Sequence, residues 1–491
     1  MELKILAKNT LILASPKVLK FFVGILRAKF IAVFLGLTGA GIIDQLQDTI
    51  TQIRNFTLSG LSDGMVKLIA HQNGIEIDVQ KIGSIIKTYL VMIIPITITV
   101  TILGYIYADE ITLYIFGNIQ YKLYFQIGFI ALPLAILSST ANALLKAYKE
   151  IRSFATAEVY IILINLIIFL PLVYFYKIPG GVVYVTLSFL VTFLVVFFLM
   201  RKNVFKKHNI TIAAIKEGII SKEYFKNLLA FISYGVVGGV FYVFTEVTIR
   251  AIVVNDLGID KLGLYTPITR WSNLFLGFIM PAIYTYLYPR LSEAKSDTEI
   301  TAVVNDVFRL ITFIALPFVI VGISTRQWII PLFYSNEFID ASLYLPYHFS
   351  TLIFVIWSSI FAQIFWPTGR LMHQFIFVII INALSLGLIY YFVPIFGLYG
   401  YLIKFTIVPL ITALMYLGFW RTRIKFKFKK ENITIILYAL LCSVVLLLLK
   451  DSVIYLQLVS VCLIIVLYFL LKKQERDFLM KKIKVIFTKK N

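Results

Sequence analysis

Residues 44–71 place charged side chains in a segment long enough to cross a lipid bilayer, and they read DQLQDTITQIRNFTLSGLSDGMVKLIAH. In a helix, the apolar residues of this segment lie on one side; they are Leu46, Ile50, Ile53, Leu61 and Leu68. The polar side chains gather on the other side within an arc of roughly 100°; they are Asp44, Asp48, Thr51, Asn55, Ser59 and Ser62. Since an ionised group costs ~2.5–3.5 kcal/mol at the bilayer centre, the polar face is expected to line water or to meet partner charges.

Three further apolar segments carry residues that could act together with this face. Arg27 and Arg250 lie in two of them, and Glu246 precedes Arg250 by four residues, so the two side chains can pair on one helix face. The third, at 263–288, has polar residues four apart with an arginine beside them; these are Tyr265, Thr269, Asn273 and Arg270. The whole set predicts an aqueous pathway through the membrane. Simple neutralisation of each charge by a buried neighbour is the alternative that the sequence leaves open.

The composition identifies the elements that must position these residues. Sixty per cent of the 491 residues are hydrophobic and 14% are charged, which a water-soluble domain of this length could not accommodate. A transmembrane helix needs roughly 20 mostly apolar residues, and about fourteen such windows follow one another along the chain. They are 9–34, 42–70, 84–107, 121–146, 154–176, 181–200, 227–253, 263–288, 303–325, 341–368, 373–394, 398–420, 432–449 and 452–471. The sequence therefore predicts an all-α integral membrane protein.

The formal charge of +21 is distributed between the helices rather than along one surface. Basic residues cluster at 201–222, at 421–430 and in the tail from Lys472, whereas alternate loops such as 107–110 and 255–258 are poor in them. This alternation is the positive-inside pattern, and it places both termini in the cytoplasm. The charge then serves orientation and contact with membrane lipids, so no nucleic-acid partner is expected.

Motifs of the common soluble chemistries are missing from the sequence. It contains no metal-ligand spacing, P-loop, dinucleotide-binding glycine motif or G-x-S-x-G. Cys442 and Cys462 both lie inside apolar windows, where packed or lipid-facing thiols are favoured over a disulfide. We therefore expect no catalytic residues, no metal and no cofactor.

An internal duplication is visible at a nearly constant offset. GLTGAG at 36–41 matches GIDKLG at 258–263, and Pro95 matches Pro317 in the middle of a later helix, each 222 residues on. LRA at 26–28 matches IRA at 249–251. Six helices separate the copies, so both copies enter the membrane from the same side and the repeats are parallel. Both prolines are candidate hinges.

The duplication predicts four parts of the chain. Residues 1–200 form an N-lobe with helices 1–6, and residues 201–222 form a basic cytoplasmic linker. Residues 223–422 form a C-lobe with helices 7–12, facing the N-lobe across a central cavity. Residues 423–491 add helices 13–14 and a basic cytoplasmic tail outside the repeat.

The sequence resembles the Wzx-type polysaccharide flippases, in the superfamily that also holds the multidrug (MATE) exporters and the lipid II flippases. The resemblance covers about 1–422 and rests on LRAKFIAVFLGLTGAG, GLSDGMVKLIAHQNG, the linker SKEYFKNLLAFISYG and the duplicated halves. It implies movement of an undecaprenyl-pyrophosphate-linked oligosaccharide to the outer leaflet of a bacterial inner membrane, driven by a proton or sodium gradient. O-antigen and lipopolysaccharide synthesis is the setting it implies, with polysaccharide polymerases or glycosyltransferases as possible partners.

The resemblance also suggests residue roles. It assigns a cationic cavity for the pyrophosphate to Arg27, Arg54, Arg250 and Arg270. Asp48 and Glu246 become candidates for ion coupling, because they lie near arginines and can change charge. A multidrug or cation exporter of the same superfamily and a membrane-embedded polymerase or glycosyltransferase remain as alternatives. The exporter should favour an acidic aromatic pocket, and the enzyme usually needs a larger outward segment carrying carboxylates.

Overall fold

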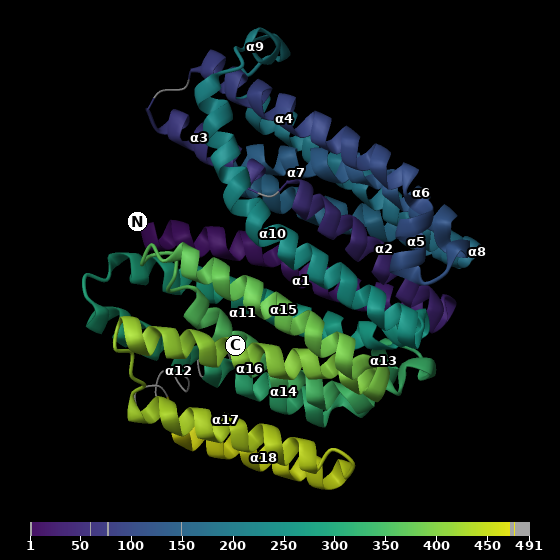
Figure 1. Ribbon diagram of the computed structural model, residues 1–491, viewed down its shortest axis with the longest axis vertical. Helices are drawn as coiled ribbons and strands as arrows, with labels where there is room; N and C mark the ends of the chain where they lie inside the picture. The colour runs from purple at the N-terminus through teal and green to yellow at the C-terminus, as the bar shows by residue number, and fades with distance from the viewer. Residues whose placement is uncertain (1, 59, 76–77, 149, 472–475, 477–491) are drawn as a thin grey trace, which may run out of the picture. The chain divides into compact units, whose positions relative to one another are not determined.

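A computed structural model describes residues 2–58, 60–75, 78–148, 150–471 and 476, and Figure 1 shows that they fold mainly into helices. No β-strand occurs among these residues, so the predicted all-α class is confirmed. The helices of the first half are α1 (Glu2–Phe34), α2 (Gly36–Thr57), α3 (Leu61–Ile75), α4 (Val79–Ile106), α5 (Ala108–Phe116), α6 (Lys122–Phe129), α7 (Ala131–Ala147) and α8 (Ile151–Met200).

The second half repeats this helical pattern and adds a hairpin. Its helices are α9 (Ile212–Glu217), α10 (Lys222–Leu257), α11 (Ile259–Glu293), α12 (Asp297–Ser324), α13 (Arg326–Phe333), α14 (Ala341–Ala362), α15 (Leu371–Phe396), α16 (Leu398–Arg423), α17 (Lys430–Leu448) and α18 (Val453–Leu470). Short turns of other helix types, η1 (Ile119–Tyr121), η2 (Arg201–Phe205) and η3 (Asn336–Phe338), connect them.

Within the described residues, nine helices are long and apolar enough to cross a membrane. One of them, Arg152–Phe205, contains both predicted spans 154–176 and 181–200. The predicted spans 9–34, 42–70, 227–253 and 263–288 are also helical, on α1, α2 with α3, α10 and α11, but they are not among the nine. These four are the segments that carry the charged and polar candidates. The structure is consistent with fourteen spans without confirming that number.

Helix α8 is a hairpin of two helices rather than one rod. Lys177 interrupts the helical backbone with φ 52° and ψ −131°. Phe169 and Tyr184, on either side of this turn, meet edge to face with ring centroids 4.9 Å apart. Two residues so placed around a turn can touch only if the flanking helices run antiparallel. The turn therefore lies where the sequence separates two spans.

The segment predicted as one helix over 42–70 is two helices in the structure. α2 ends at Thr57 and α3 begins at Leu61, and Gly60 between them has a positive φ of 72°. A left-handed backbone is tolerated by glycine and ends the regular hydrogen-bond ladder. The matching motifs at 36–41 and 258–263 form the junctions before α2 and α11 and the first turns of these helices.

The duplication extends to short elements that the sequence did not reveal. α4 and α12 are each 28 residues long, and each contains its mid-helix proline, Pro95 or Pro317. Each is followed by a short helix, α5 or α13, and then by a single turn of 3-10 helix, η1 or η3. The repeated order indicates that both halves descend from the same folding unit.

Packing divides the chain into two compact units. The first comprises Met1–Thr266, Phe333–Phe338 and Val378–Leu398. The second comprises Pro267–Leu332, Ile339–Phe377 and Tyr399–Asn491. The predicted lobes end at 200 and begin again at 223 because the sequence repeats there, whereas the two units are defined by packing. The lobe limits stay a prediction.

In the first unit, the linker after α8 folds onto the first turns of α4. Figure 1 shows α9 beside this N-terminal end of α4. The Lys87 ammonium donates to the Lys216 carbonyl at 2.6 Å, and the Ile219 amide donates to the Ser84 hydroxyl at 2.9 Å. Asp78 caps α4 by accepting from the amides of Gln80 and Lys81. The hydrogen bond from the Lys81 amide holds the pKa of Asp78 below its usual value.

In the second unit, polar residues of α12 fasten the hairpin of α17 and α18. The buried Arg309 guanidinium donates to the carbonyls of Glu431 at 3.3 Å and Leu470 at 3.0 Å, one on each arm. The buried Asn432 amide donates to the Asn305 side-chain oxygen at 2.8 Å. These bonds join the hairpin to the repeat and give helices 13–14 a defined place within the unit.

Candidate functional site

The charged cluster is centred on Arg250 of α10, within the first unit. The Nη1 and Nη2 atoms of Arg250 donate to the Asp44 carboxylate of α2 at 3.1 and 3.2 Å. Its Nε atom lies 3.2 Å from the Asp48 carboxylate, one turn along the same helix. The side chains of Arg250, Asp44 and Asp48 retain only 15%, 22% and 28% of their exposure. The guanidinium therefore bridges two carboxylates inside the protein.

Gln45 extends this cluster and was not singled out by the sequence. Its side-chain oxygen accepts from Arg250 at 3.3 Å, and its amide nitrogen donates to the Ile115 carbonyl of α5 at 3.1 Å. Gln45 is fully buried, so each of its polar atoms needs a partner. The residue fixes α2 between α10 and α5, which positions Asp44 and Asp48 for the arginine.

The two sides of α2 differ as the helical periodicity predicts. Leu46 and Ile50 are completely buried and Asn55 is exposed, whereas Thr51 and Ile53 are both half-buried, so Ile53 is less buried than its predicted apolar side implies. Further along, on α3, the Ser62 hydroxyl lies 3.3 Å from the Tyr89 hydroxyl of α4. Of the other predicted cavity residues, Ser59 lies outside the described residues.

Arg27 occupies a different environment from Arg250. Its guanidinium carbon lies 4.9 Å from the ring centroid of Phe169 and 4.8 Å from that of Tyr184, one ring from each arm of α8. A guanidinium over aromatic faces is stabilised by their quadrupoles. Cation–π contacts with α8 therefore hold the positively charged guanidinium of Arg27 between α1 and α8.

The remaining predicted arginines are Arg54 and Arg270, one in each unit. Arg54, near the end of α2, donates to the Asn55 side-chain oxygen at 2.9 Å. Arg270 is half-buried on α11 in the second unit. The predicted polar residues of α11 divide between the units, because Tyr265 belongs to the first, where it is buried, and Thr269 and Asn273 belong to the second.

Equivalent residues of the two repeats meet where α2 and α11 begin. The Thr38 hydroxyl donates to the Asp260 carboxylate at 2.6 Å across 222 residues of sequence. A Cβ on Gly41 would lie 2.3 Å from the Ile259 carbonyl oxygen, and one on Gly263 would lie 2.0 Å from that of Leu37. Only glycine permits backbones to approach this closely. The two helix starts are therefore packed backbone against backbone.

A short segment from the second repeat closes over the same region. The Lys29 ammonium of α1 donates to the Tyr334 carbonyl. The Glu337 carboxylate lies against Gly36, at the junction of α1 and α2. Residues 333–338 consequently pack with the first unit although they follow α12 in the chain. The offset of 222 residues between the repeats makes Thr38 and Asp260 equivalent, so the sequence held a signal for their contact. No sequence pattern indicated the contact of Lys29 with Tyr334.

These features define a multi-pass membrane protein whose interior holds an arginine between carboxylates, with two parallel helical repeats that meet at their equivalent helix starts. The profile of the family described as "Polysaccharide biosynthesis protein" matches residues 49–343. The chain belongs to this family, which confirms the resemblance found in the sequence.

Relatives and solved structures agree with this assignment. The lipid III flippase of Escherichia coli (strain K12) is 25% identical over 350 residues, which cover 68% of this chain and 78% of that protein. Among solved structures, the lipid II flippase MurJ in an inward closed conformation matches with a TM-score of 0.72, at 15% identity, over 94% of this chain and 98% of its own. An inward-facing MATE family transporter matches with a TM-score of 0.71, at 16% identity, over 85% and 98%. The two structures establish the shared fold.

Proposed function

We propose that this protein is a flippase that moves an undecaprenyl-pyrophosphate-linked oligosaccharide from the cytoplasmic to the outer leaflet of a bacterial inner membrane, with both termini in the cytoplasm. The observation that carries the proposal is Arg250, a permanent cation held inside the membrane by Asp44 and Asp48. Its relative of 25% identity is a lipid III flippase, and its family is one of polysaccharide biosynthesis proteins.

Arginine suits a pyrophosphate cargo for geometric reasons. A pyrophosphate carries at least two negative charges, and the planar guanidinium can bind two phosphate oxygens at once, which a lysine ammonium cannot reproduce. In the structure the same donors of Arg250 engage Asp44. A pyrophosphate would therefore compete with this carboxylate for the arginine. Arg27, Arg54 and Arg270 supply further positive charge along α1, α2 and α11 in this proposal.

Exchange of arginine partners offers a route for coupling to an ion gradient. Asp48 forms an ion pair with Arg250, and Glu246 lies one helical turn before Arg250 on α10. Protonation or sodium binding at either carboxylate would weaken its hold on the arginine and favour the cargo; loss of the ion would restore the closed pair. Asp48 and Glu246 are thus the proposed coupling groups.

A second function, export of an organic cation, is favoured by one observation. Asp44 and Asp48 together exceed the charge of Arg250, so the bridged cluster is formally acidic. A cationic drug could use the same carboxylates once the arginine is displaced. A multidrug resistance MATE family transporter shares this fold, so the fold does not select between the two cargoes. A transport assay must therefore decide whether the cargo is a lipid-linked oligosaccharide or an organic cation.

The test uses the intact protein in proteoliposomes with an imposed pH or sodium gradient. We expect gradient-driven movement of the lipid-linked oligosaccharide, impaired by Arg250→Lys, more strongly impaired by Arg250→Ala and unaffected by Arg201→Lys in the exposed linker. Uptake of a lipophilic organic cation instead, lost in Asp44→Asn, would establish the exporter. Full activity of Arg250→Ala and Arg27→Ala would remove the pyrophosphate role, and full gradient dependence of Asp48→Asn and Glu246→Gln would remove both coupling groups.

Partners follow from the same proposal. A flippase delivers its cargo to the outer leaflet, where a polymerase or a glycosyltransferase acts on the oligosaccharide, as in O-antigen and lipopolysaccharide synthesis. Co-purification of such an enzyme with the tagged protein from its host membrane tests this part. Purification without any of these enzymes under mild detergent would contradict a stable complex.

A further inference from the structure

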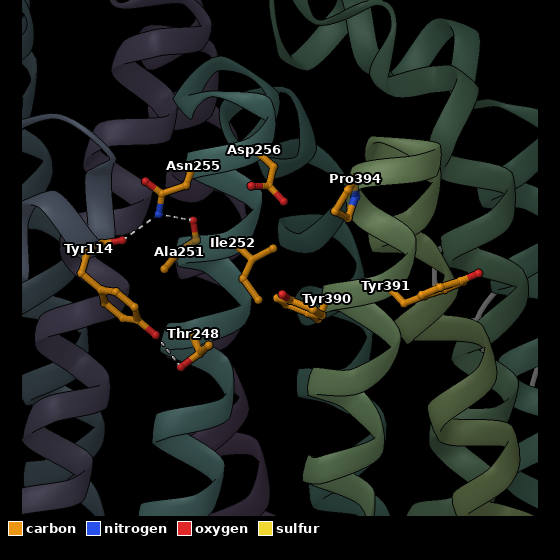
Figure 2. A pocket seen from close by; sticks show the side chains of 9 residues that line it. All are labelled: Tyr114, Thr248, Ala251, Ile252, Asn255, Asp256, Tyr390, Tyr391 and Pro394. Carbon is orange, nitrogen blue, oxygen red and sulfur yellow. Dashed lines mark hydrogen bonds between the residues drawn. The ribbon is translucent and has the colours of Figure 1, made fainter.

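A cavity of about 490 Å³ lies in the first unit between α5, α10 and the end of α15. Figure 2 shows Tyr114 of α5 and Tyr390 of α15 on its two sides, with Thr248 and Asp256 of α10 between them. Its volume falls within the roughly 300–1,000 Å³ typical of clefts that bind small molecules. The site is separate from the Arg250 cluster, whose residues do not line it.

The lining combines aromatic rings with hydrogen-bond acceptors. Tyr390 and Tyr391 are 76% and 63% exposed, so their rings are available to a ligand. The Tyr114 hydroxyl donates to the Thr248 hydroxyl at 2.8 Å, and the Asn255 amide donates to the Tyr114 carbonyl at 3.0 Å. These bonds hold the α5 wall of the cavity against α10 and fix the orientation of the Tyr114 ring.

Asp256 supplies the charge of the cavity. Its side chain is exposed, and no hydrogen bond or ion pair engages its carboxylate in the described part of the chain. An ionised carboxylate only accepts hydrogen bonds, and it can take two hydroxyl donors at once. Among the described residues that line the cavity there is no lysine or arginine, and the Asp256 carboxylate disfavours a phosphate there.

The position of the cavity connects it with the outer side of the membrane. Asp256 is the penultimate residue of α10, and Tyr390 lies in the last two turns of α15. By the charge pattern of the loops, both helix ends face away from the cytoplasm. A ligand in this cavity would meet the protein at the outer headgroup region.

We propose that this cavity is a binding site for the sugar portion of the cargo, an uncharged or amine-bearing saccharide. This rests on the proposed function. A sugar ring presents apolar C–H groups that pack on tyrosine faces and hydroxyls that donate to the Asp256 carboxylate. The pyrophosphate end engages arginine, and the saccharide end engages tyrosine and aspartate. The site would hold the saccharide as the cargo leaves on the outer side.

The experiment measures saccharide binding to the intact protein in lipid nanodiscs. The probe is the host's repeat-unit oligosaccharide, cleaved from its lipid carrier and freed of phosphate, and binding is followed by calorimetry and by saturation-transfer NMR. We expect Tyr390→Leu and Asp256→Asn each to weaken binding by about ten-fold. Tyr107→Leu should leave it unchanged, because Tyr107 is an exposed tyrosine at the end of α4 that does not line the cavity.

Two further measurements separate this site from the proposed function. The Arg250→Ala variant should bind the phosphate-free oligosaccharide with the wild-type affinity. Inorganic pyrophosphate should not displace the oligosaccharide from the wild-type protein. No binding by the wild type, or equal affinity in Tyr390→Leu and Asp256→Asn, would overturn the site and leave these tyrosines as anchors at the membrane interface. Failure of proteoliposomes to move the lipid-linked oligosaccharide, with saccharide binding intact, would overturn the proposed function alone.

Discussion

Thr38 and Asp260 hold the same position in the two repeats, and they are hydrogen bonded to each other at 2.6 Å. The first turns of α2 and α11 therefore meet at this pair, and Gly41 and Gly263 also pack backbone to backbone there. The loop charges predict that these helix starts lie on the outer side. We propose that they form a closed contact there, which outward opening separates.

The first prediction is that fixing this contact stops transport. With Cys442 and Cys462 replaced by serine, Thr38→Cys and Asp260→Cys together should form a disulfide, because their side chains already meet. Oxidation should abolish movement of the lipid-linked oligosaccharide in proteoliposomes, and reduction should restore it. Each single cysteine variant serves as the control. Undiminished transport by the fully oxidised double variant would show that the contact need not open.

The second prediction concerns the glycines at the same contact. Gly263→Ala should force α2 and α11 apart, because its Cβ would lie 2.0 Å from the Leu37 carbonyl oxygen. Gly277→Ala on the same helix meets nothing within 4 Å and is the matched control. We expect Gly263→Ala alone to raise the reactivity of a cysteine at Thr38 toward an impermeant thiol reagent added outside. Equal reactivity in the two variants would contradict the closed contact.

The third prediction tests the cavity along α2. Cysteines at Thr51 and Asn55 should react with an impermeant thiol reagent, while cysteines at Leu46 and Ile50 should not, because these two positions are fully buried. The measurement is mass-spectrometric labelling in inverted and right-side-out vesicles. Comparable labelling of both faces would contradict an aqueous pathway beside α2.

Periodicity predicted much of this helix, but not its partner. The spacing of apolar residues was sufficient to place Leu46 and Ile50 in the core, since a helix repeats every 3.6 residues whatever surrounds it. The spacing of Glu246 and Arg250 suggested a pair within one helix. The structure also bridges Arg250 to Asp44, 206 residues away. Local spacing carries no information about which helix packs beside α10, so this contact could be found only in the fold.

The break between α2 and α3 shows a second limit of the sequence. Residues 42–70 keep a helical periodicity throughout, and Gly60 within a helical pattern costs only about 1 kcal/mol relative to alanine. The positive φ of Gly60 and the packing of Leu61 and Met65, both fully buried, decide that the chain turns there. By contrast, the sequence held a signal for the contact between Thr38 and Asp260, because the repeat offset makes them equivalent residues. A parallel duplication can place some equivalent residues next to each other.

The fourth prediction concerns the candidate hinges. Pro95 and Pro317 each remove one helical hydrogen bond at equivalent places in α4 and α12. Alanine at either position should straighten its helix and slow transport while membrane insertion stays normal, measured by proteoliposome assay and by the amount of protein in the membrane. Transport at the wild-type rate in both variants would identify the prolines as packing features only.

The last prediction concerns the hairpin that lies outside the duplication. Arg309 donates to the Glu431 and Leu470 carbonyls and stacks on the Phe313 ring at 4.8 Å, so it holds α17 and α18 to α12 from one side chain. Arg309→Met preserves length and apolar contact but leaves two carbonyls without this donor, and it should cost about 2 kcal/mol of stability. The thermal midpoint of the detergent-purified protein should fall accordingly.

The exposed Arg423 provides the control, because its guanidinium stacks on Phe419 of its own helix, and Arg423→Met should change the midpoint little. Limited proteolysis between α16 and α17 should become faster in Arg309→Met and not in Arg423→Met, since the hairpin would detach before the repeat unfolds. A normal midpoint and normal proteolysis in Arg309→Met would mean that Asn305 and Asn432, whose side chains are bonded at 2.8 Å, are sufficient to hold the hairpin.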